Sequence, residues 1–407
     1  MPLGLYISVP FCRTKCTYCN FASDVFSKTV FQRYVDRICD DLAQATTKAE
    51  LMGGSMEPTV DSVYFGGGTP TILDIDQLER LFVTVWQNFD VQRDAEITVE
   101  CAPGTLSPEI IRLFERRRVN RVSLGVQSFV DQEASSVARL HNRSTVLDDI
   151  TRLREAGITN LNLDLIAGLP HQTAESWEFS LQQVIATQAP HVSVYMLEVD
   201  DDSRLGRELI AGGTKYHAHF VPDEDLTANM YETACDRLEA AGISQYEISN
   251  FARPGSESRH NLKYWTRQPY LGFGVDAHSM LPVEQRLSAA LVPAASHGVG
   301  SKAVAIRFST PDTLERYVAG SSSGPKPIDH QSALEETMFL GLRLNRGVDL
   351  DEVTRDFGSR EVSSLIPVIA ELVQASLLQR QGNTIRLTPR GRLLSNEVFE
   401  RFLAVSK

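Results

Sequence analysis

Residues 3–19 read LGLYISVPFCRTKCTYC, an apolar run that leads directly into three closely spaced cysteines. The aliphatic run Leu3–Val9 predicts a buried strand, which Pro10 ends. The cysteines, Cys12, Cys16 and Cys19, therefore occupy a loop at the carboxyl end of that strand. Because thiolates are soft ligands for zinc and for iron–sulfur clusters, this loop predicts a metal centre.

The number of nearby ligands bears on which metal this loop holds. A structural zinc site needs a fourth ligand, and Cys39 is the next cysteine along the chain. Cys39 lies in a helical pattern that begins near Phe31, where the apolar spacing favours packing over ligation. Three thiolates on a four-iron cluster leave one iron open to another ligand, so the loop favours such a cluster. Zinc and a coincidental grouping of cysteines stay open as alternatives.

Outward from this loop, β-branched runs alternate with amphipathic stretches as far as about residue 200. Five further runs predict strands, at Val60–Phe65, Glu96–Glu100, Arg121–Val126, Asn160–Ile166 and His191–Leu197. The spacing predicts a helix after each strand, and the candidate N-caps are Asp76, Ser107, Ser144 or Thr145, and Thr173. Six strand–helix units predict a parallel sheet, either an open doubly wound sheet or an incomplete TIM-type barrel.

Glycine and polar residues follow the predicted strands, at the edge where parallel α/β folds build their sites. The second strand runs into Gly66-Gly-Gly-Thr-Pro70, the third into Cys101 and the fourth into Gln127. Three glycines let a backbone approach a ligand closely, and no Lys-Ser/Thr follows as in a phosphate-binding loop. A ligand site is therefore expected at this edge of the sheet.

The alternation stops beyond about residue 220. The pattern there predicts a helix over Asp225–Ala241 and a short strand over Gln245–Ile248. A polar and aromatic loop is expected over Asn250–Trp265, and a surface excursion over Pro282–Ala305. Three helices and a hairpin around Gly382-Asn383 then predict a winged-helix-like segment, with the helices over Leu334–Leu344, Leu350–Phe357 and Val362–Leu377. We expect three domains, over residues 1–220, 221–310 and 311–407.

Composition narrows the functional classes. The 407 residues include 40 Lys and Arg against 52 Asp and Glu, a formal charge of −12, which argues against a nucleic-acid binder. Residues 331–407 hold ten acidic and ten basic residues, so the winged-helix-like segment carries no basic footprint. No apolar run approaches the ~20 residues of a membrane span, and Met1–Val9 lacks the features of a signal peptide. A cytoplasmic protein is expected.

The spacing Cys-x3-Cys-x2-Cys, with Tyr18 just before the last cysteine, resembles the signature of the radical S-adenosylmethionine (SAM) superfamily. The resemblance implies that Cys12, Cys16 and Cys19 hold a [4Fe–4S] cluster whose open iron is chelated by the amino and carboxylate groups of SAM. It also implies that electron transfer from the cluster cleaves SAM to a 5′-deoxyadenosyl radical. The fold implied is an α/β partial (β/α)6 TIM-type barrel with a mainly α C-terminal domain.

Within this superfamily the whole chain resembles the oxygen-independent coproporphyrinogen III oxidase-like family. The stretches that carry the resemblance are LYISVPFC at 5–12, GVQSF at 125–129 and NLDLIAGLP at 162–170. The resemblance implies a ribose-binding role for Asp164. It implies SAM contacts from a set of residues at the strand ends, namely Tyr6, Gly67, Gly68, Thr69, Glu100, Gln127, Arg139 and Asp164.

Two departures separate the chain from the oxidases of this family. Phe21 stands where the oxidases have a fourth cysteine, and the cysteines lie near the start of the sequence. Both features are similar to the HemW-like haem chaperone branch, as is the motif His260-Asn-Leu-Lys-Tyr-Trp265. This resemblance implies haem contacts from His260, Asn261, Tyr264 and Trp265. Ser8 stands where relatives usually have His.

We therefore expect a radical SAM haem chaperone that binds a [4Fe–4S] cluster, SAM and haem and delivers haem to a respiratory haem protein. A flavodoxin or ferredoxin is the expected type of electron donor. The alternative is an oxidoreductase of porphyrin biosynthesis that decarboxylates coproporphyrinogen III with the deoxyadenosyl radical, so enzymatic activity is left open. A more remote alternative is a winged-helix regulator that senses through its cluster. The sequence leaves open whether the protein forms a homodimer and whether it associates peripherally with the membrane.

Overall fold

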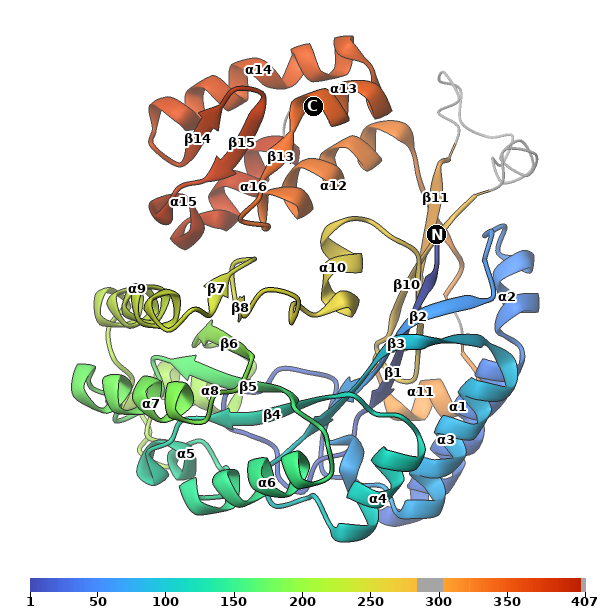
Figure 1. The fold of residues 1–407 in the computed structure, drawn as a ribbon, viewed down its shortest axis with the longest axis vertical. Helices are drawn as coiled ribbons and strands as arrows, with labels where there is room; N and C mark the ends of the chain where they lie inside the picture. Colours follow the sequence, from blue (N-terminus) through green and yellow to red (C-terminus); the bar gives the residue numbers. More distant parts are fainter. Residues whose placement is uncertain (284–302, 322, 404–407) are drawn as a thin grey trace.

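The computed structural model describes residues 1–283, 303–321 and 323–403. Its main feature is a curved twelve-stranded sheet in the order β12-β11-β10-β9-β1-β2-β3-β4-β5-β6-β8-β7 (Figure 1). Neighbouring strands from β9 to β6 along this order are parallel, and the strands at both ends are antiparallel. The six predicted strands are confirmed, as β1 (Leu3–Val9), β2 (Thr59–Gly67), β3 (Asp90–Cys101), β4 (Arg121–Gln127), β5 (Asn160–Ala167) and β6 (His191–Met196).

Helices cover the outer face of this arc, as expected for a partial (β/α)6 barrel (Figure 1). They are α1 (Phe31–Ala43), α3 (Ile75–Asn88), α4 (Pro108–Arg116), α6 (Arg143–Glu155), α7 (Ala174–Ala186) and α9 (Glu224–Ala240). Their apolar faces and the strands share one large core, in which Cys39 packs as predicted. Shorter helices are α2 (Ala45–Leu51), α5 (Asp131–Ser136), α8 (Arg204–Ala211) and α11 (Leu314–Val318), with 3-10 turns at Lys28–Val30, Pro70–Ile72 and Ala218–Phe220.

Two of the predicted N-caps are confirmed and two are wrong. Ser107 and Thr173 cap α4 and α7 by accepting backbone N–H groups. The cap of α3 is Asp74 rather than Asp76, because Asp74 forms a reciprocal capping box with Gln77. The cap of α6 is Asn142 rather than Ser144 or Thr145. In both cases a second polar residue inside the first turn mimics the cap in the sequence.

The region after residue 240 departs most from the prediction. The short strand predicted at Gln245–Ile248 is confirmed only at its start, as β7 (Ser244–Gln245), which pairs with β8 (Asn250–Ala252) across a turn that holds Glu247. The loop predicted at Asn250–Trp265 is wrong, since it contains β8 and the helix α10 (Arg259–Trp265). Four strands were not predicted, β9 (Tyr270–Phe273), β10 (His278–Pro282), β11 (Ala305–Ser309) and β12 (Lys326–Ile328). Most of the predicted surface excursion lies outside the described residues.

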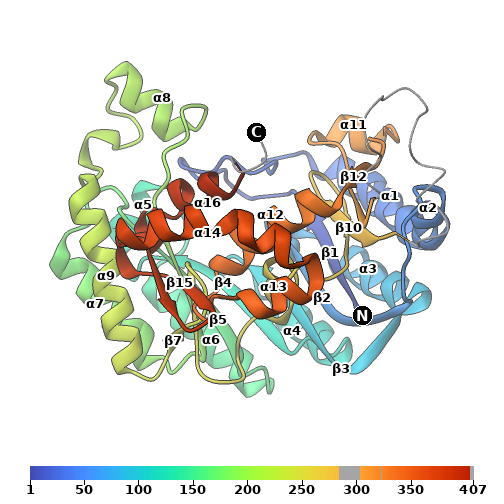
Figure 2. The same cartoon turned by 90° about the horizontal axis from the view of Figure 1, so that it is seen from above.

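The C-terminal part forms a mainly helical unit that lies across the open side of the arc (Figures 1 and 2). Its core runs from Leu334 onward and includes Ile248 of the preceding region, whereas Tyr317 packs in the core of the barrel. The sequence places the start of this domain at residue 311. Its elements are α12 (His330–Leu342), β13 (Val348–Asp349), α13 (Leu350–Phe357), α14 (Ser359–Gln374), β14 (Leu378–Gln381), β15 (Thr384–Leu387), α15 (Pro389–Leu393) and α16 (Ser395–Leu403). The predicted hairpin is thus confirmed as β14–β15.

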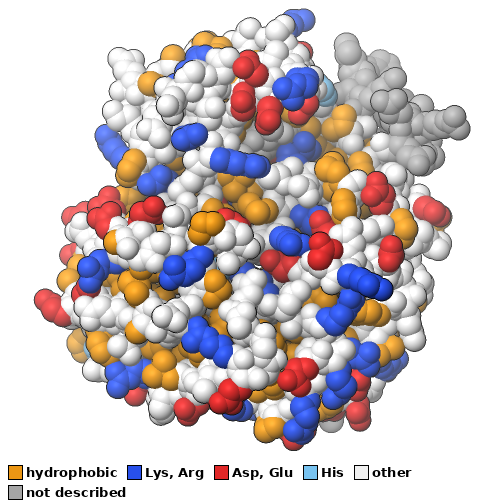
Figure 3. All heavy atoms as spheres, viewed as in Figure 1, with side chains coloured by type: hydrophobic (Ala, Val, Ile, Leu, Met, Phe, Trp, Pro, Cys, Tyr) orange, Lys and Arg blue, Asp and Glu red, His pale blue; other side chains and the backbone are white. Residues whose placement is uncertain are grey.

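The two units are joined by polar contacts. The buried carboxylate of Glu336 on α12 accepts hydrogen bonds from Arg267, which precedes β9, at 2.9 Å and from Arg307 of β11 at 2.9 Å. Asn345 donates from its backbone N–H to the carbonyl of Tyr246 at 2.9 Å. On the face shown in Figure 3, acidic and basic side chains are interspersed over both units. No helix among the described residues is long and apolar enough to cross a membrane.

Candidate functional site

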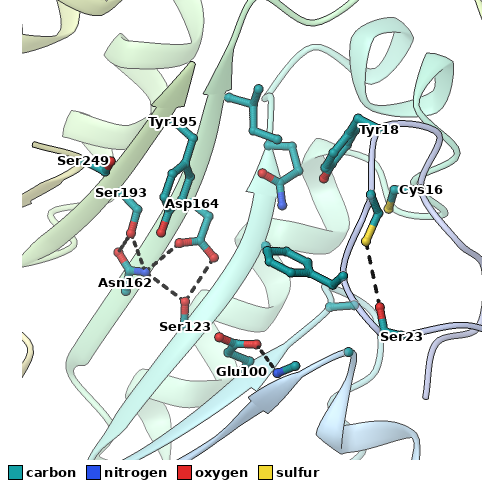
Figure 4. Close-up of a pocket in the computed structure, with 18 of the residues that line it drawn as sticks. Cys16, Tyr18, Ser23, Glu100, Ser123, Asn162, Asp164, Ser193, Tyr195 and Ser249 are labelled. Carbon is teal, nitrogen blue, oxygen red and sulfur yellow. Dashed lines mark hydrogen bonds between the residues drawn. The ribbon is translucent and has the colours of Figure 1, made fainter. Parts of the chain in front are cut away.

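A cavity of about 650 Å³ lies inside the arc, at the carboxyl ends of the parallel strands (Figure 4). Its volume is in the range of small-molecule sites, roughly 300–1,000 Å³. The structure brings most of the predicted site residues into its wall, namely Cys12, Cys16, Cys19, Gly67, Gly68, Thr69, Glu100, Gln127, Arg139, Asp164 and Asn261. Four predicted residues do not line this cavity, Tyr6, His260, Tyr264 and Trp265.

Backbone hydrogen bonds within residues 12–24 hold the shape of the cysteine loop. The N–H of Cys12 donates to the carbonyl of Asp24 at 3.0 Å, and the N–H of Cys19 donates to that of Cys16 at 3.2 Å. All three thiols are half-buried, and burial raises the pKa of the Cys12 thiol. In the described part of the chain no three His, Cys, Asp or Glu side chains are close enough to share one metal ion. Three thiols grouped in one loop are a donor set that suits an iron–sulfur cluster with one open iron.

The glycine loop lies directly against the cysteine loop. The N–H of Gly68 donates to the carbonyl of Val9 at 2.9 Å, and that of Thr69 to the carbonyl of Phe11 at 2.8 Å. A Cβ atom on Gly68 would lie 2.8 Å from the carbonyl oxygen of Val9 and 2.8 Å from that of Phe11, which is too close for any side chain. Gly67 has φ +102°, in the left-handed region. Glycine is thus required at both positions for the two loops to form one wall.

Glu100 presents a carboxylate to the cavity from the end of β3. It accepts hydrogen bonds from the N–H of Gly67 at 3.1 Å and from the hydroxyl of Tyr64 at 2.7 Å. Burial raises the pKa of Glu100 to about 7, with the nearby Asp164 carboxylate adding to the rise. A carboxylate held this way is poised to pair with a cationic group of a ligand.

Two further polar side chains in the wall have atoms without a hydrogen-bond partner among the described residues. Buried Gln127 has a side-chain oxygen without a hydrogen-bond partner among the described residues, and it holds φ at +68°. Arg139 donates from Nη2 to the hydroxyl of Tyr18 at 3.0 Å, but its Nε has no partner in the same part of the chain. Because buried polar atoms are normally satisfied, these two point to a ligand in the cavity.

Asp164 belongs to a polar network that sequence reasoning missed (Figure 4). It accepts from the hydroxyl of Ser123 at 3.1 Å and from the amide of Asn162 at 2.8 Å. The Asn162 amide also donates to Ser193 at 3.0 Å, and Ser193 donates to Asn250 at 2.8 Å. The signal was present, because polar residues recur at every second position on the inward face of β4, β5 and β6.

The helix α10 places its histidine in the protein interior. His260 is 1% exposed, and burial lowers the pKa of its imidazole to about 3. Its Nδ1 is hydrogen-bonded to Ser62 at 3.0 Å and its Nε2 to Tyr264 at 2.8 Å. The ring packs near Tyr64, with centroids 5.3 Å apart. Both nitrogens of His260 are therefore engaged, unlike those of a histidine on an open loop.

The other residues of this motif lie at different depths. Asn261 lines the cavity. The Arg343 guanidinium lies over the Trp265 ring, 4.4 Å from its centroid, and the indole N–H has no partner among the described residues.

Tyr6 packs behind the wall, 6.0 Å from Tyr64 by ring centroid. Tyr64, which the sequence did not single out, occupies the wall instead.

Comparison with known proteins gives matches over both units. Residues 6–184 match the Radical SAM superfamily, and residues 328–394 match the HemN C-terminal domain. A protein of Bacillus subtilis named Heme chaperone HemW is 33% identical over 400 residues, covering 98% of this chain and 98% of the relative. A protein of the same name from Lactococcus lactis is 31% identical over 406 residues, covering 99% of this chain and 97% of the relative.

A solved structure shares the fold. The coproporphyrinogen III oxidase HemN of Escherichia coli, a radical SAM enzyme, superposes with a TM-score of 0.79. The alignment covers 98% of this chain and 90% of that chain, at 23% sequence identity. At this identity the likeness establishes the architecture of barrel and C-terminal unit.

Proposed function

Because this chain belongs to the HemW-type haem chaperones of the radical SAM superfamily, we propose that it binds a [4Fe–4S] cluster, SAM and haem. The observation that carries the proposal is one cavity whose wall combines the three thiols of the cysteine loop, a glycine cradle and unsatisfied polar groups. The proposed role is delivery of haem to a respiratory haem protein. A flavodoxin or ferredoxin is the proposed electron donor.

The cavity wall near β1 fits an iron–sulfur cluster. Cys12, Cys16 and Cys19 would hold it, and the donor set of three thiols suits a cluster with one iron open to a further ligand. When bound together, a cluster and SAM supply one-electron chemistry. The protein's own contribution is to fix the thiols and to keep the site enclosed by the barrel wall.

The remaining wall fits the polar groups of SAM. The Glu100 carboxylate faces the cavity beside the glycine loop and would pair with the amino group. Asp164, held by Ser123 and Asn162, would accept hydrogen bonds from the ribose hydroxyls. Gln127 and Arg139 would satisfy their free side-chain atoms on the same ligand.

Replacing Asp164 by Ala is expected to weaken SAM binding by one to two orders of magnitude, because two charge-assisted hydrogen bonds to the ribose are lost. Equilibrium SAM binding to the reconstituted protein measures the effect. Exposed Asp148 on α6 provides the matched control, and Asp148→Ala should bind SAM as the wild type does. Iron content should not change in either variant. An unaltered affinity in Asp164→Ala would remove this carboxylate from the SAM site.

The motif on α10 remains our proposed haem-binding element. Asn261 already faces the cavity, and Trp265 lies under Arg343, which also lines it. His260 acts as an iron ligand only after α10 releases the contacts to Ser62 and Tyr264. Haem ligation by this imidazole is thus coupled to a shift of the helix.

The proposed function is tested by anaerobic titration of the reconstituted protein with haemin. We expect stoichiometric binding that is weaker in His260→Ala and Asn261→Ala. His278→Ala is the control, since this histidine on β10 is 59% exposed and does not line the cavity. Absence of haemin binding in the wild type would overturn the chaperone proposal. Coproporphyrinogen III would then be the next ligand to test, as the substrate of the alternative enzymatic function.

A further inference from the structure

The C-terminal unit contributes two arginines to the cavity wall. Arg343 follows directly after α12, and Arg392 lies in α15. Backbone contacts fix the position of Arg343, because Leu344 forms a bridge with Glu247 and Asn345 donates to the carbonyl of Tyr246. The barrel and the C-terminal unit therefore meet at a wall that carries positive charge.

Both guanidinium groups are only partly satisfied. The Nε atoms of Arg343 and Arg392 are buried and lack hydrogen-bond partners in the described part of the chain. The nearest contact of Arg343 with a carboxylate is 4.0 Å, from Nη2 to Oε2 of Glu247, which is beyond hydrogen-bond distance. No described carboxylate lies within 4.0 Å of Arg392. Buried guanidinium nitrogens that lack a hydrogen-bond partner are available to an anion.

Arg343 lies on the side of the cavity away from the cysteine loop, beside Glu247. Ser249, two residues after the Glu247 that neighbours Arg343, is on the opposite side of the cavity from Cys16 and Tyr18 (Figure 4). Asn162 and Asp164 lie between the two sides. The groups proposed to meet the amino and ribose parts of SAM lie at Glu100 and Asp164, so the two arginines are left for a different ligand.

The aromatic contact of Arg343 indicates what kind of ligand this is. Its guanidinium carbon lies over the Trp265 ring, 4.4 Å from the centroid, so an apolar ring and a cationic hydrogen-bond donor lie next to each other. Haem is a planar apolar macrocycle with two propionate carboxylates on one edge. A pair of arginines on one wall matches this pair of charges, and guanidinium binds carboxylate through two parallel hydrogen bonds.

We propose that Arg343 and Arg392 form a carboxylate subsite that receives the propionates of haem. This inference rests on the proposed function, since it assigns the part of the same cavity that would bind one edge of the haem. It assigns to the C-terminal unit a direct role in ligand binding, in addition to covering the barrel. The subsite acts on the propionate carboxylates, so it is independent of which residue ligates the iron.

The test compares haemin with its dimethyl ester, in which both carboxylates are masked. Both are titrated anaerobically, under identical solvent conditions, into the reconstituted full-length wild type and into the double variant Arg343→Gln, Arg392→Gln. We expect the wild type to bind haemin at least tenfold more tightly than the ester, because the ester cannot form the charge-assisted hydrogen bonds between the propionates and the two arginines. The double variant should bind both ligands equally, with ester affinity unchanged from the wild type. Unchanged ester affinity also shows that the variant is folded.

Two further variants sharpen the result. Arg390→Gln removes an exposed arginine from the same helix α15 and should retain the wild-type preference. The double variant Arg343→Lys, Arg392→Lys keeps both positive charges and should retain part of the preference for haemin over the ester. Equal binding of haemin and ester by the wild type would overturn the subsite while the chaperone proposal stands. Binding of neither ligand by the wild type would overturn the proposed function, and the subsite with it.

Discussion

Simultaneous replacement of Cys12, Cys16 and Cys19 by Ala is expected to reduce the iron and sulfide of anaerobically reconstituted protein to background. The absorbance of the wild type near ~400 nm, which is expected of iron–sulfur charge transfer, should disappear with them. The physical reason is that these three thiols are soft ligands grouped in one loop of the cavity wall, whereas the fourth thiol of the wall, Cys101, lies at the end of β3. Metal and sulfide analysis of wild type and variant, reconstituted in parallel, measures the effect.

A matched control is available on the outer helices. Cys235 lies on α9, outside the cavity wall, and Cys235→Ala should reconstitute with the same iron and sulfide content as the wild type. Circular dichroism of the triple variant shows whether the barrel is folded without its thiols. Retention of iron and sulfide by a folded triple variant would refute the assignment of the cluster to this loop.

The affinity for SAM is expected to fall about tenfold for each pH unit below about pH 7, and to be constant above it. Burial raises the pKa of Glu100 to about 7, so below this pH the ligand-free protein holds the neutral acid. The ionised carboxylate is the form that accepts hydrogen bonds from the N–H groups of the SAM amino nitrogen most strongly. Binding at lower pH must therefore expel a proton from Glu100, and the affinity decreases as the pH falls.

Two substitutions separate this effect from other titrations. Glu100→Gln should remove the pH dependence and weaken SAM binding by roughly 10- to 100-fold, the loss expected for a hydrogen bond to a charged group. Tyr64→Phe should shift the midpoint to higher pH, because the Tyr64 hydroxyl donates to the carboxylate at 2.7 Å and stabilises its charged form. Binding of SAM measured between pH 5.5 and 8.5 checks both. A pH-independent affinity in the wild type would exclude Glu100 as the partner of the amino group.

The parallel part of the fold was predictable because its signal is local. Each of the six strands is a short β-branched run, and each is followed by an amphipathic helix, so the order of elements follows from neighbouring residues. The strands β9 to β12 gave no such signal. Their pairing partners are distant in sequence, as with Tyr270 of β9 and Gly4 of β1, and no helix alternates with them.

The candidate site was predictable in part. The cysteine loop, the glycine loop and Glu100 stand out because unusual residues end predicted strands. The position of His260 could not be derived, because its surroundings come from remote segments. Ser62 bonds its ring, and Glu96 accepts its backbone N–H at 3.1 Å. A motif rich in polar and aromatic residues can form an exposed loop or a buried helix, and its sequence pattern is the same in both cases. Only the distant residues that bond to it decide between the two.

The sheet stops short of closure, and this affects how proteins of this architecture diverge. A closed eight-stranded barrel fills its interior with layers of its own side chains. Here β12 and β7 each have a single neighbouring strand in the described part of the chain, and the interior stays hollow. The apolar core lies where the strands meet the outer helices, so residues that face the hollow are under weak packing constraint. The residues that meet the ligand can therefore differ between proteins of this architecture while the core that holds the fold stays the same.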